Sequence, residues 1–337
     1  MVRIAIQGLG RIGRLALRRA IGTPGVEIVG LNDLGDTRSL AHLVKYDSVH
    51  GRAPFPVSHT AESLVLDSRS IPCGQAPTPA GLPFGALGAE VVLDCAGRAR
   101  QRFELDAHLQ GSVTHVLAGS LVEGVDLTVI PGLNEAQLDP VRHRVVSAAT
   151  GSSHALGLLL KVLDEAFGVD AALATVVHAY TSEQKILDLP HPDLRKARAA
   201  AASMIPAPTA SVDVLMDLLP HLRGRLEGMA VRVPTPDVSL VDLTATLRQD
   251  VDAAAVNTAF TQAAQARPHL LEVNEDELVS ADLVGCSASC AFDPYLTRVL
   301  APRFVKVYGW FDNEWAFACR LIELAQRLGS APREVRP

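Results

Sequence analysis

The turn Gly8-Leu9-Gly10-Arg11-Ile12-Gly13 constrains the fold of this chain more than any other feature. It follows an apolar, β-type run at residues 2–6 and opens a segment in which Ile12, Leu15 and Ala16 share one helical face. A G-x-G-x-x-G sequence between a strand and a helix is the fingerprint of a dinucleotide-binding unit. Its glycines permit a tight turn, close approach to a pyrophosphate and packing of the helix on the strand. We therefore predict an N-terminal Rossmann-type domain.

Asp33 extends this pattern. The next strand candidate, residues 26–31, ends in Asn32-Asp33, and Asp33 lies 20 residues beyond Gly13. A carboxylate at this spacing accepts hydrogen bonds from a ribose diol and repels a 2′-phosphate, so the pattern favours NAD over NADP. The alternative is a glycine turn followed by an aspartate that only caps a helix.

The rest of the first half repeats the alternation of strand and helix. Further strand candidates are residues 90–95, 115–118, 126–130 and 144–147, with helical or turn-rich segments between them. Such an alternation predicts a mostly parallel sheet with helices on both faces, an α/β doubly wound fold. Residues 52–87 are rich in Pro, Gly and Ser, and we expect loops and short strands at the sheet edge there.

The second half has a different character. Strand candidates at residues 171–181, 228–233, 239–247 and 303–311 have few helices between the later ones, which predicts an α+β domain with an antiparallel sheet. The long segment 187–209 carries His191 and the basic residues Arg195, Lys196 and Arg198. A loop of this length in a compact enzyme is usually functional or part of an interface. Apolar positions from Leu321 to Leu328 predict a terminal helix that ends at Gly329.

Composition limits the possible partners. A chain of 337 residues with 48% hydrophobic content can bury a large core, and we expect two domains. The formal net charge of −6 provides no basic surface for nucleic acid or an acidic membrane, so the expected partner is a small molecule. The sequence shows neither an apolar signal segment nor a membrane-spanning run, which favours a cytoplasmic location.

The cysteines give little support to a disulfide framework or a metal site. There are five, an odd number scattered along the chain: Cys73, Cys95, Cys286, Cys290 and Cys319. Cys286 and Cys290 have the spacing of half a metal site, but no second Cys or His pair at ligand spacing follows them. We therefore predict ordinary packed cysteines and no metal.

Residues 147–155 look like an active site that lacks its nucleophile. A strand ends at Ser147, and Leu159, Val162 and Leu163 then recur with helical spacing. A helix start presents free backbone N–H groups and the positive end of the helix dipole, so it binds anions and lowers the pKa of a thiol placed on it. No thiol is present, and Gly151 stands where a nucleophile is expected.

Several motifs together resemble the phosphorylating glyceraldehyde-3-phosphate dehydrogenase family, in the same order from residue 1 to about 328. They are AIQGLGRIGR at 5–14, ND at 32–33, KYDSVHG at 45–51, VHAYT at 177–181, RVPTP at 232–236 and WFDNEW at 310–315. The resemblance implies an NAD-binding Rossmann domain over residues 1–150, completed by a C-terminal helix at 314–330, and a catalytic domain over 151–313. It also implies a homotetramer in which the loop at 181–202 reaches a neighbour's cofactor site.

The resemblance further implies a role for each matching residue. In the family a cysteine attacks the aldehyde, a histidine takes the proton, hydride passes to NAD, and phosphate cleaves the thioester. Position 151 matches the cysteine and His178 matches the histidine. Thr181, Arg195 and Arg232 would bind the substrate phosphate, and Thr150, Ser152, Thr209 and Ala210 would hold inorganic phosphate or a mimic oxyanion. The cofactor would contact Gly8, Gly10, Arg11, Ile12, Gly13, Asp33, Gly97, Gly119 and Asn313.

Each assignment has a structural alternative. A histidine on a strand is often a hydrogen-bonded core residue. Arg195 and Arg232 could form solvated charges or interface salt bridges, and Asn313 could merely cap the last helix. Ser152 or Ser153 could be proposed as a nucleophile, but a serine with no base beside it in the sequence is better explained as a phosphate ligand.

The departures from the family pattern raise a question about activity. Where the family has Ser-Asn-Ala-Ser-Cys-Thr-Thr-Asn-Cys, residues 147–155 read SAATGSSHA, which differs at seven of nine positions. Gly119-Ser120-Leu121 and Ala96 also depart from it, so the chain has the pattern of a natural, divergent branch. Gly151 itself is either a deliberate substitution in an active enzyme or the mark of a branch that lost or replaced the reaction.

Three functions remain open on the sequence. The favoured one is an NAD-dependent oxidoreductase that acts on a small phosphorylated aldehyde, first of all glyceraldehyde 3-phosphate, with its nucleophile missing in the chain as written. The second is a non-catalytic protein that binds NAD or a sugar phosphate. The third is a dehydrogenase in which His178 activates water or the aldehyde hydrate without a covalent intermediate.

Overall fold

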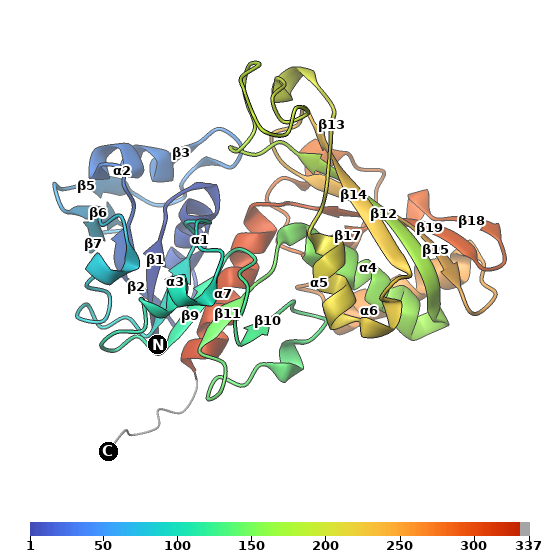
Figure 1. Ribbon diagram of the computed structural model, residues 1–337, viewed down its shortest axis with the longest axis horizontal. Coiled ribbons are helices and arrows are strands. Elements are labelled where there is room, and N and C mark those ends of the chain that lie inside the picture. Colours follow the sequence, from blue (N-terminus) through green and yellow to red (C-terminus); the bar gives the residue numbers. More distant parts are fainter. Residues whose placement is uncertain (331–337) are drawn as a thin grey trace. The chain divides into compact units, whose positions relative to one another are not determined.

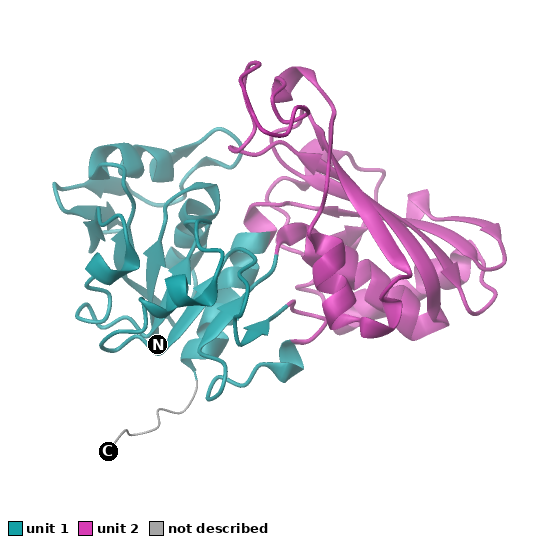
Figure 2. Cartoon of the chain, in the orientation of Figure 1, with its two compact units in different colours: residues 1–129, 135–149, 317–337 teal, residues 130–134, 150–316 magenta. Residues whose placement is uncertain are grey.

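In the computed structural model, which describes residues 1–330, the chain divides into two units (Figure 2). Unit 1 contains residues 1–129, residues 135–149 and the chain from residue 317 onward, and unit 2 contains residues 130–134 and 150–316. Figure 1 labels the helices and strands of both units.

Unit 1 is built on one twisted sheet. Its strands are β1 (Val2–Gln7), β2 (Val26–Asn32), β5 (Val57–His59), β6 (Ser63–Leu66), β7 (Arg69–Gly74), β8 (Val91–Asp94), β9 (His115–Ala118), β10 (Leu127–Thr128) and β11 (Val145–Ser147). Their order is β10-β11-β9-β8-β1-β2-β7-β6-β5, and only the pairs that involve β6 are antiparallel. The mostly parallel sheet and the short strands at its edge are both confirmed. Strands β3 (Tyr46–Asp47) and β4 (Gly51–Arg52) form a separate small ribbon.

The helices of unit 1 follow from local sequence signals. Helix α1 (Arg11–Ile21) buries Leu15 and Ala16 and packs on β1 and β2, as its apolar face predicts. Helix α2 (Thr37–Lys45) begins at Asp36, whose side chain accepts the Ser39 amide. Helices α3 (Arg102–Asp106) and α7 (Trp315–Gly329) complete the set.

The strand order opens a crevice at the centre of the sheet. Strand β1 pairs with β2 on one side and with β8 on the other, so the chain changes direction across the sheet between β1 and β8. In sheets of this kind, ligands bind at the carboxyl ends of the strands beside such a switch point. The end of β1 is where the glycine-rich turn begins.

Unit 2 contains the second large sheet. Its strands are β12 (Val169–Ala179), β13 (Ile205–Ala207), β14 (Leu226–Val233), β15 (Ser239–Leu247), β16 (Leu271–Val273), β17 (Cys290–Phe292), β18 (Arg298–Ala301) and β19 (Phe304–Phe311). The order is β13-β14-β12-β15-β19-β17-β16, with β18 paired to β19. Strand β12 lies two residues earlier at both ends than the sequence indicated.

The sheet of unit 2 is mixed, which corrects the expectation of an antiparallel sheet. Most pairs are antiparallel, but β12 with β14 and β16 with β17 run parallel. A parallel pair needs a long crossover connection, and helix α5 (Ser211–Leu218) lies in the segment that joins β12 to β14. This short helix was not predicted from the sequence.

Helix α4 (Gly151–Phe167) is the central helix of unit 2. It packs on β12, β15, β17 and β19 and against α5 and α6 (Ala253–Ala266). Leu156, Leu159 and Leu160 on this helix are fully buried. Helix α4 therefore begins at Gly151, as the sequence predicts, and its start is held by the core beneath it.

Short 3₁₀ turns and the cysteines complete the description. The turns are η1 (Pro79–Gly81), η2 (Glu135–Gln137), η3 (Ala200–Ala202), η4 (Pro220–Leu222), η5 (Ser280–Leu283) and η6 (Pro294–Leu296). All five cysteines are free, and Cys73, Cys290 and Cys319 are buried. Within residues 1–330, no helix combines the length and apolar character needed to cross a membrane.

Candidate functional site

A pocket of about 160 Å³ lies at the switch point of the sheet in unit 1. Its walls include the ends of three strands and the loops that follow them: Gln7, Gly8, Asn32, Asp33, Cys95 and Ala96. This is the crevice in which a doubly wound sheet binds a dinucleotide.

Each glycine of the fingerprint has a separate physical role. Gly8 has a φ of +86°, and a Cβ atom on it would lie 2.6 Å from the backbone nitrogen of Ala96. A Cβ atom on Gly13 would lie 1.9 Å from the carbonyl oxygen of Gly8, so α1 can approach the strand only if residue 13 is glycine. Gly10, by contrast, faces open space, with no atom within 4 Å of the position of a Cβ. Gly8 and Gly13 serve the fold, and Gly10 leaves room for a ligand.

Asp33 is held in place by backbone amides. Its Oδ2 accepts a hydrogen bond from the Leu9 amide at 2.7 Å, and its Oδ1 accepts one from the Gly35 amide at 3.0 Å. The alternative in which Asp33 caps a helix is wrong, because Asp36 is the residue that caps α2. Asp33 instead ties the end of β2 to the glycine-rich turn.

The other predicted cofactor residues lie around the same strand ends. Arg11 and Ile12 are the first two residues of α1. Gly97 has a φ of +63° in the segment after β8. Gly119 follows β9, and a Cβ atom on it would lie 3.4 Å from the Asp94 carbonyl. A side chain at position 119 would therefore be tightly packed.

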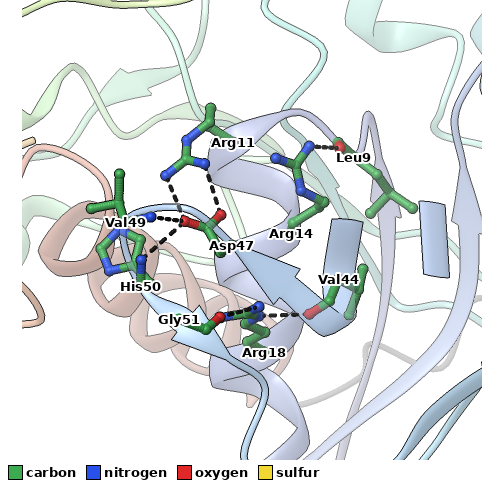
Figure 3. Close-up of polar contacts among 9 residues, drawn as sticks. All are labelled: Leu9, Arg11, Arg14, Arg18, Val44, Asp47, Val49, His50 and Gly51. Atoms are coloured by element: carbon green, nitrogen blue, oxygen red, sulfur yellow. Dashed lines mark hydrogen bonds and ion pairs between the residues drawn. The ribbon is translucent and has the colours of Figure 1, made fainter. Parts of the chain in front are cut away.

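The side chain of Arg11 makes a contact that the sequence did not reveal (Figure 3). Its guanidinium binds Asp47 through two bonds, from Nη1 at 2.7 Å and from Nη2 at 3.1 Å. Asp47 Oδ1 also accepts the Val49 and His50 amides, and its side chain is only 3% exposed. Two turns further along α1, Arg18 donates to the carbonyl oxygens of two residues that flank this loop, Val44 and Gly51.

Asp47 is therefore a fixed anion beside the start of α1. Burial acts to raise its pKa, but the His50 and Val49 amides and Arg11 outweigh burial and lower the pKa to about 2. A two-pronged arginine–carboxylate pair of this kind holds both position and orientation. It anchors the loop at residues 44–51 to the start of α1.

We expect Asp47→Asn to destabilise the protein by about 2 kcal/mol at pH 7, because the charge on Asp47 is stabilised in the folded state. The folded pKa lies below the ordinary value of 3.8, so this contribution is complete above pH 4 and is lost as the pH falls towards 2. Urea unfolding of both proteins between pH 7 and pH 3 measures it. Equal stabilities of the unmodified protein and Asp47→Asn at pH 7 would contradict the prediction. Arg11→Leu and the double variant complete a double-mutant cycle that measures the interaction between Arg11 and Asp47.

In unit 2, the start of α4 is shaped by Thr150. Its side chain accepts the Ser153 amide, while the Ser153 hydroxyl accepts the Thr150 amide, so the two residues cap the helix reciprocally. The preceding residue, Ala149, has a φ of +57°, an uncommon conformation for a residue other than glycine. This turn leaves Gly151 as the first residue of the helix.

Position 151 has room for a side chain. A Cβ atom there would lie 3.6 Å from the Asn313 carbonyl oxygen and 3.8 Å from Phe311 Cδ2, which are ordinary contact distances. The ring of His178 meets the same Phe311 edge-on, with the ring centroids 6.1 Å apart. Position 151 and His178 therefore both adjoin Phe311.

Three hydroxyl groups form a buried cluster beside position 151. Ser211 Oγ lies 2.7 Å from Ser152 Oγ and 3.4 Å from Thr150 Oγ1, and the latter two atoms are 3.2 Å apart. Ser211 is 1% exposed and begins α5, so the cluster joins the starts of two helices. Thr209 approaches through its Oγ1, which accepts the Ser211 amide, and Ala210 precedes α5.

Ser211 is the residue that the sequence reasoning missed. Thr150, Ser152, Thr209 and Ala210 were predicted to hold an oxyanion, and the structure brings Ser211 into the same group. Hydroxyl groups and free amides at helix starts are suitable donors for an anion. The available signal was the position of Ser211 directly after the two predicted residues.

His178 has the hydrogen bonding of a neutral imidazole. Its Nδ1 lies 2.7 Å from the Ala179 carbonyl oxygen, which can only accept, so Nδ1 carries the proton and Nε2 keeps its lone pair. Burial lowers the pKa of His178, the charge of Arg232 lowers it further, and the bond to Ala179 opposes both, with a result of about 4. The ring can therefore act as a base at neutral pH.

We expect His178 to make the protein less stable in mild acid. Its unfolded pKa is near 6.5 and its folded pKa is about 4, so between these values the unfolded chain binds the proton and the folded chain does not. Stability should fall by about 2 to 3 kcal/mol from pH 7 to pH 4.5 on this account. Urea unfolding of the unmodified protein and of His178→Gln tests this prediction. Between pH 7 and pH 4.5, the free energy of unfolding of His178→Gln should fall by about 2 to 3 kcal/mol less than that of the unmodified protein. Parallel losses in both proteins would refute the assignment.

The predicted phosphate ligands Thr181, Arg195 and Arg232 are more dispersed. Arg232 is half-buried, and its Nη1 donates weakly to the Ala179 carbonyl at 3.4 Å. Arg195 is exposed and lines a pocket of about 420 Å³ with Leu194 and Met229. Within residues 1–330, neither Thr181 nor Arg195 joins the hydrogen bonds of the hydroxyl cluster.

Asn313 does not cap the last helix. The Glu314 and Trp315 amides at the start of α7 donate to Asp312 Oδ1, at 2.9 and 2.6 Å. Asn313 Oδ1 instead accepts the Ser239 hydroxyl at 2.7 Å. The capping alternative is therefore wrong, and the Asn313 side chain is held by the sheet of unit 2.

Comparisons with known proteins match almost the whole chain. Residues 2–102 match the family model described as glyceraldehyde 3-phosphate dehydrogenase, NAD binding domain, and residues 152–313 match the C-terminal domain of the same family. The chain is similar to glyceraldehyde-3-phosphate dehydrogenase 1 of Bacillus cereus, at 43% identity over 98% of this chain and 99% of that protein. It is also similar to the glyceraldehyde-3-phosphate dehydrogenases of Streptomyces coelicolor (40% identity, 98% and 99%) and Geobacillus stearothermophilus (41%, 98% and 98%).

Proposed function

We propose, from the premise that the chain belongs to the glyceraldehyde-3-phosphate dehydrogenase family, that it binds NAD, glyceraldehyde 3-phosphate and inorganic phosphate but lacks the nucleophile of the family reaction. The observation that carries this proposal is the set of groups around position 151. His178 presents an unprotonated Nε2, and Thr150, Ser152 and Ser211 present hydroxyls, but residue 151 has no side chain.

The proposed roles in unit 1 follow from the pocket beside β1. Gly10 leaves space for the pyrophosphate, and the amides of Arg11 and Ile12 at the start of α1 donate to it. Asp33 accepts from the adenosine ribose and disfavours a 2′-phosphate. Bound NAD supplies a hydride acceptor. Gly97 and Gly119 keep side chains away from the cofactor site, and Asn313 holds the nicotinamide carboxamide.

The proposed roles in unit 2 follow from charge and hydrogen bonding. Arg232, Arg195 and Thr181 bind the phosphate of the aldehyde, because guanidinium groups match phosphate oxygens. The hydroxyl cluster, with Thr209 and the amides at the start of α5, holds the inorganic phosphate or a mimic such as arsenate. His178 accepts a proton at Nε2 while its Nδ1 stays bound to Ala179.

The glycine at position 151 limits the chemistry that this chain can carry out. Glycine has no atom that can attack a carbonyl, so the protein does not form the thiohemiacetal of the family route. The site otherwise has the residues that the reaction needs, which supports descent from an active enzyme. A binding protein for NAD and a sugar phosphate is the second candidate, and the absent nucleophile is the observation in its favour.

We also propose a cytoplasmic homotetramer. The five free cysteines are consistent with a reducing compartment. The loop at 181–202 exposes large apolar side chains, with Ile186, Leu187 and Leu194 more than 70% accessible, as expected of a surface that another subunit covers.

Calorimetry of the unmodified chain tests the proposal. We expect saturable binding of NAD and of inorganic phosphate, together with no phosphate-dependent formation of NADH. Ser211→Ala should weaken phosphate binding by about tenfold, because it removes one buried donor to the anion. The matched control is Thr297→Ala, which removes a buried hydroxyl bound to Asn257 elsewhere in unit 2. If the unmodified chain binds neither NAD nor phosphate, the proposal is wrong.

A further inference from the structure

Ser239 links two groups that the proposed function uses separately. It begins β15, is 1% exposed, and lies between the ends of β12 and β19. Its Oγ accepts the Ala179 amide at 3.1 Å and donates to Asn313 Oδ1 at 2.7 Å. No role was predicted for this residue from the sequence.

Proton counting fixes the orientation of the Asn313 carboxamide. A serine hydroxyl has one proton, and because Ser239 accepts from Ala179, that proton must go to another acceptor. Asn313 Oδ1 is that acceptor. Rotation of the carboxamide by 180° would place an NH₂ group against Ser239 and leave a buried hydroxyl proton without that acceptor, which is unfavourable. Asn313 therefore offers its NH₂ group, and not its oxygen, to a ligand.

The same hydroxyl holds one side of the residue whose carbonyl orients His178. Ser239 accepts the N–H of Ala179, and the carbonyl of Ala179, in the next peptide unit, accepts from His178 Nδ1. A carbonyl can only accept, so its position beside Nδ1 selects the Nδ1-protonated tautomer and leaves Nε2 as the base. One hydroxyl group thus acts on both the base and the cofactor ligand.

The backbone before Ser239 is strained. Val238 has a φ of +60°, which is a genuine outlier for a β-branched residue. It is 3% exposed and packs in a cluster with Leu283 and Ala291, so the surrounding core holds this conformation. Strain of this kind persists only where the surrounding structure holds it, and here it lies directly before Ser239.

We propose that Ser239 is a positioning residue that sets the tautomer of His178 and makes the Asn313 carboxamide a hydrogen-bond donor to the nicotinamide. This inference rests on the proposed function, because it takes His178 as the base and Asn313 as the nicotinamide ligand. The nicotinamide must then be recognised through an acceptor, its carboxamide oxygen.

The test compares three variants. Ser239→Ala removes both bonds, Ser239→Thr keeps the hydroxyl, and Thr297→Ala removes a buried hydroxyl that also donates to an asparagine oxygen, Asn257 Oδ1, at 2.7 Å. Two properties are measured on each: the affinities for NAD and for ADP-ribose, which lacks the nicotinamide, and the tautomer of His178 by ¹⁵N NMR of the imidazole. None of these measurements requires turnover.

We expect Ser239→Ala to weaken NAD binding about tenfold while ADP-ribose binding changes less than about twofold. The His178 signal should change from one tautomer to a mixture, Ser239→Thr should restore both properties, and Thr297→Ala should alter neither. Asn313→Asp keeps an acceptor for Ser239 and replaces the NH₂ donor with a charged carboxylate oxygen that can only accept, so it should weaken NAD binding with no change of tautomer. If Ser239→Ala does not fold, Asn313→Asp still tests the role of the Asn313 NH₂ group in NAD binding.

Equal losses of NAD and ADP-ribose affinity in Ser239→Ala, or an unchanged His178 tautomer, would overturn the inference. So would an Asn313→Asp protein that binds NAD as tightly as the unmodified chain. An unmodified chain that binds ADP-ribose and NAD equally weakly overturns the proposed function instead, and the tautomer measurement then still decides whether Ser239 orients His178.

Discussion

Gly151→Cys is expected to raise the rate of phosphate-dependent NAD reduction with glyceraldehyde 3-phosphate on the order of 10⁴-fold, because it supplies the missing nucleophile to a site that is otherwise prepared. The new side chain needs no rearrangement, since the nearest atom to its Cβ lies 3.6 Å away. The start of α4 should lower the pKa of its thiol, and the neutral His178 can accept the thiol proton during the reaction. The measurement is NADH absorbance with and without phosphate, with erythrose 4-phosphate as a second substrate.

Alkylation by iodoacetamide provides an independent readout for this variant. Burial raises the pKa of Cys73 and of Cys286 to about 11, and it raises those of Cys95 and Cys290 as well, so these thiols should react slowly. A new thiol at position 151 should be modified first, and NAD reduction should stop with it.

Two controls separate the sulfur from the shape of the side chain. Gly151→Ser fills nearly the same space with a hydroxyl that is not ionised at neutral pH, and Gly151→Ala adds only the methyl group. Both should fold and bind phosphate, and both should stay inactive. If Gly151→Cys turns over no small phosphorylated aldehyde, the proposed descent from a catalytic enzyme fails and the binding-protein function becomes the better explanation.

Gly13→Ala is expected to destabilise the protein by about 3 kcal/mol or more and to abolish NAD binding. Its Cβ would lie 1.9 Å from the Gly8 carbonyl oxygen, a backbone atom that can move only if α1 shifts away from β1. That shift would displace the amides that are proposed to bind the pyrophosphate. Thermal or urea unfolding measures the first effect, and calorimetry measures the second.

Gly10→Ala is the matched control in the same turn. No atom lies within 4 Å of its Cβ position, so the free energy of unfolding should fall only by the loss of a glycine N-cap, at most about 1 kcal/mol. NAD binding should still weaken, since the methyl group enters the space proposed for the pyrophosphate. If both substitutions destabilise the protein equally, the two glycines do not have the separate roles that we assign.

The parts of the site that are local in sequence could be predicted. The glycine-rich turn and the start of α4 depend on residues that are neighbours in the chain, so spacing and helix signals were sufficient. The parallel pairing of β12 with β14 was missed because it depends on a crossover that carries α5, a helix of eight residues with weak signals.

The missed residues are those that act across long stretches of chain. Ser211 meets Ser152 from 59 positions away, and Ser239 meets Asn313 from 74 positions away. Asp47 lies in a motif that the sequence singled out, but its partner, Arg11, was predicted only as a contact of the cofactor. A hydrogen bond between distant side chains leaves no periodic trace in a sequence, so one chain read alone cannot reveal it.

The contact between the end of α7 and β1 affects the order in which the chain can fold during translation. Gly329 packs against Val2 so closely that a Cβ atom on it would lie 2.2 Å from the Val2 side chain, and Gln326 donates to the Pro24 carbonyl. Val2 at the start of β1 is therefore translated more than 300 residues before the helix that it contacts. Unit 2, whose residues end at 316, is released earlier and can fold first. During that interval, the Val2 side chain lacks its contact with Gly329.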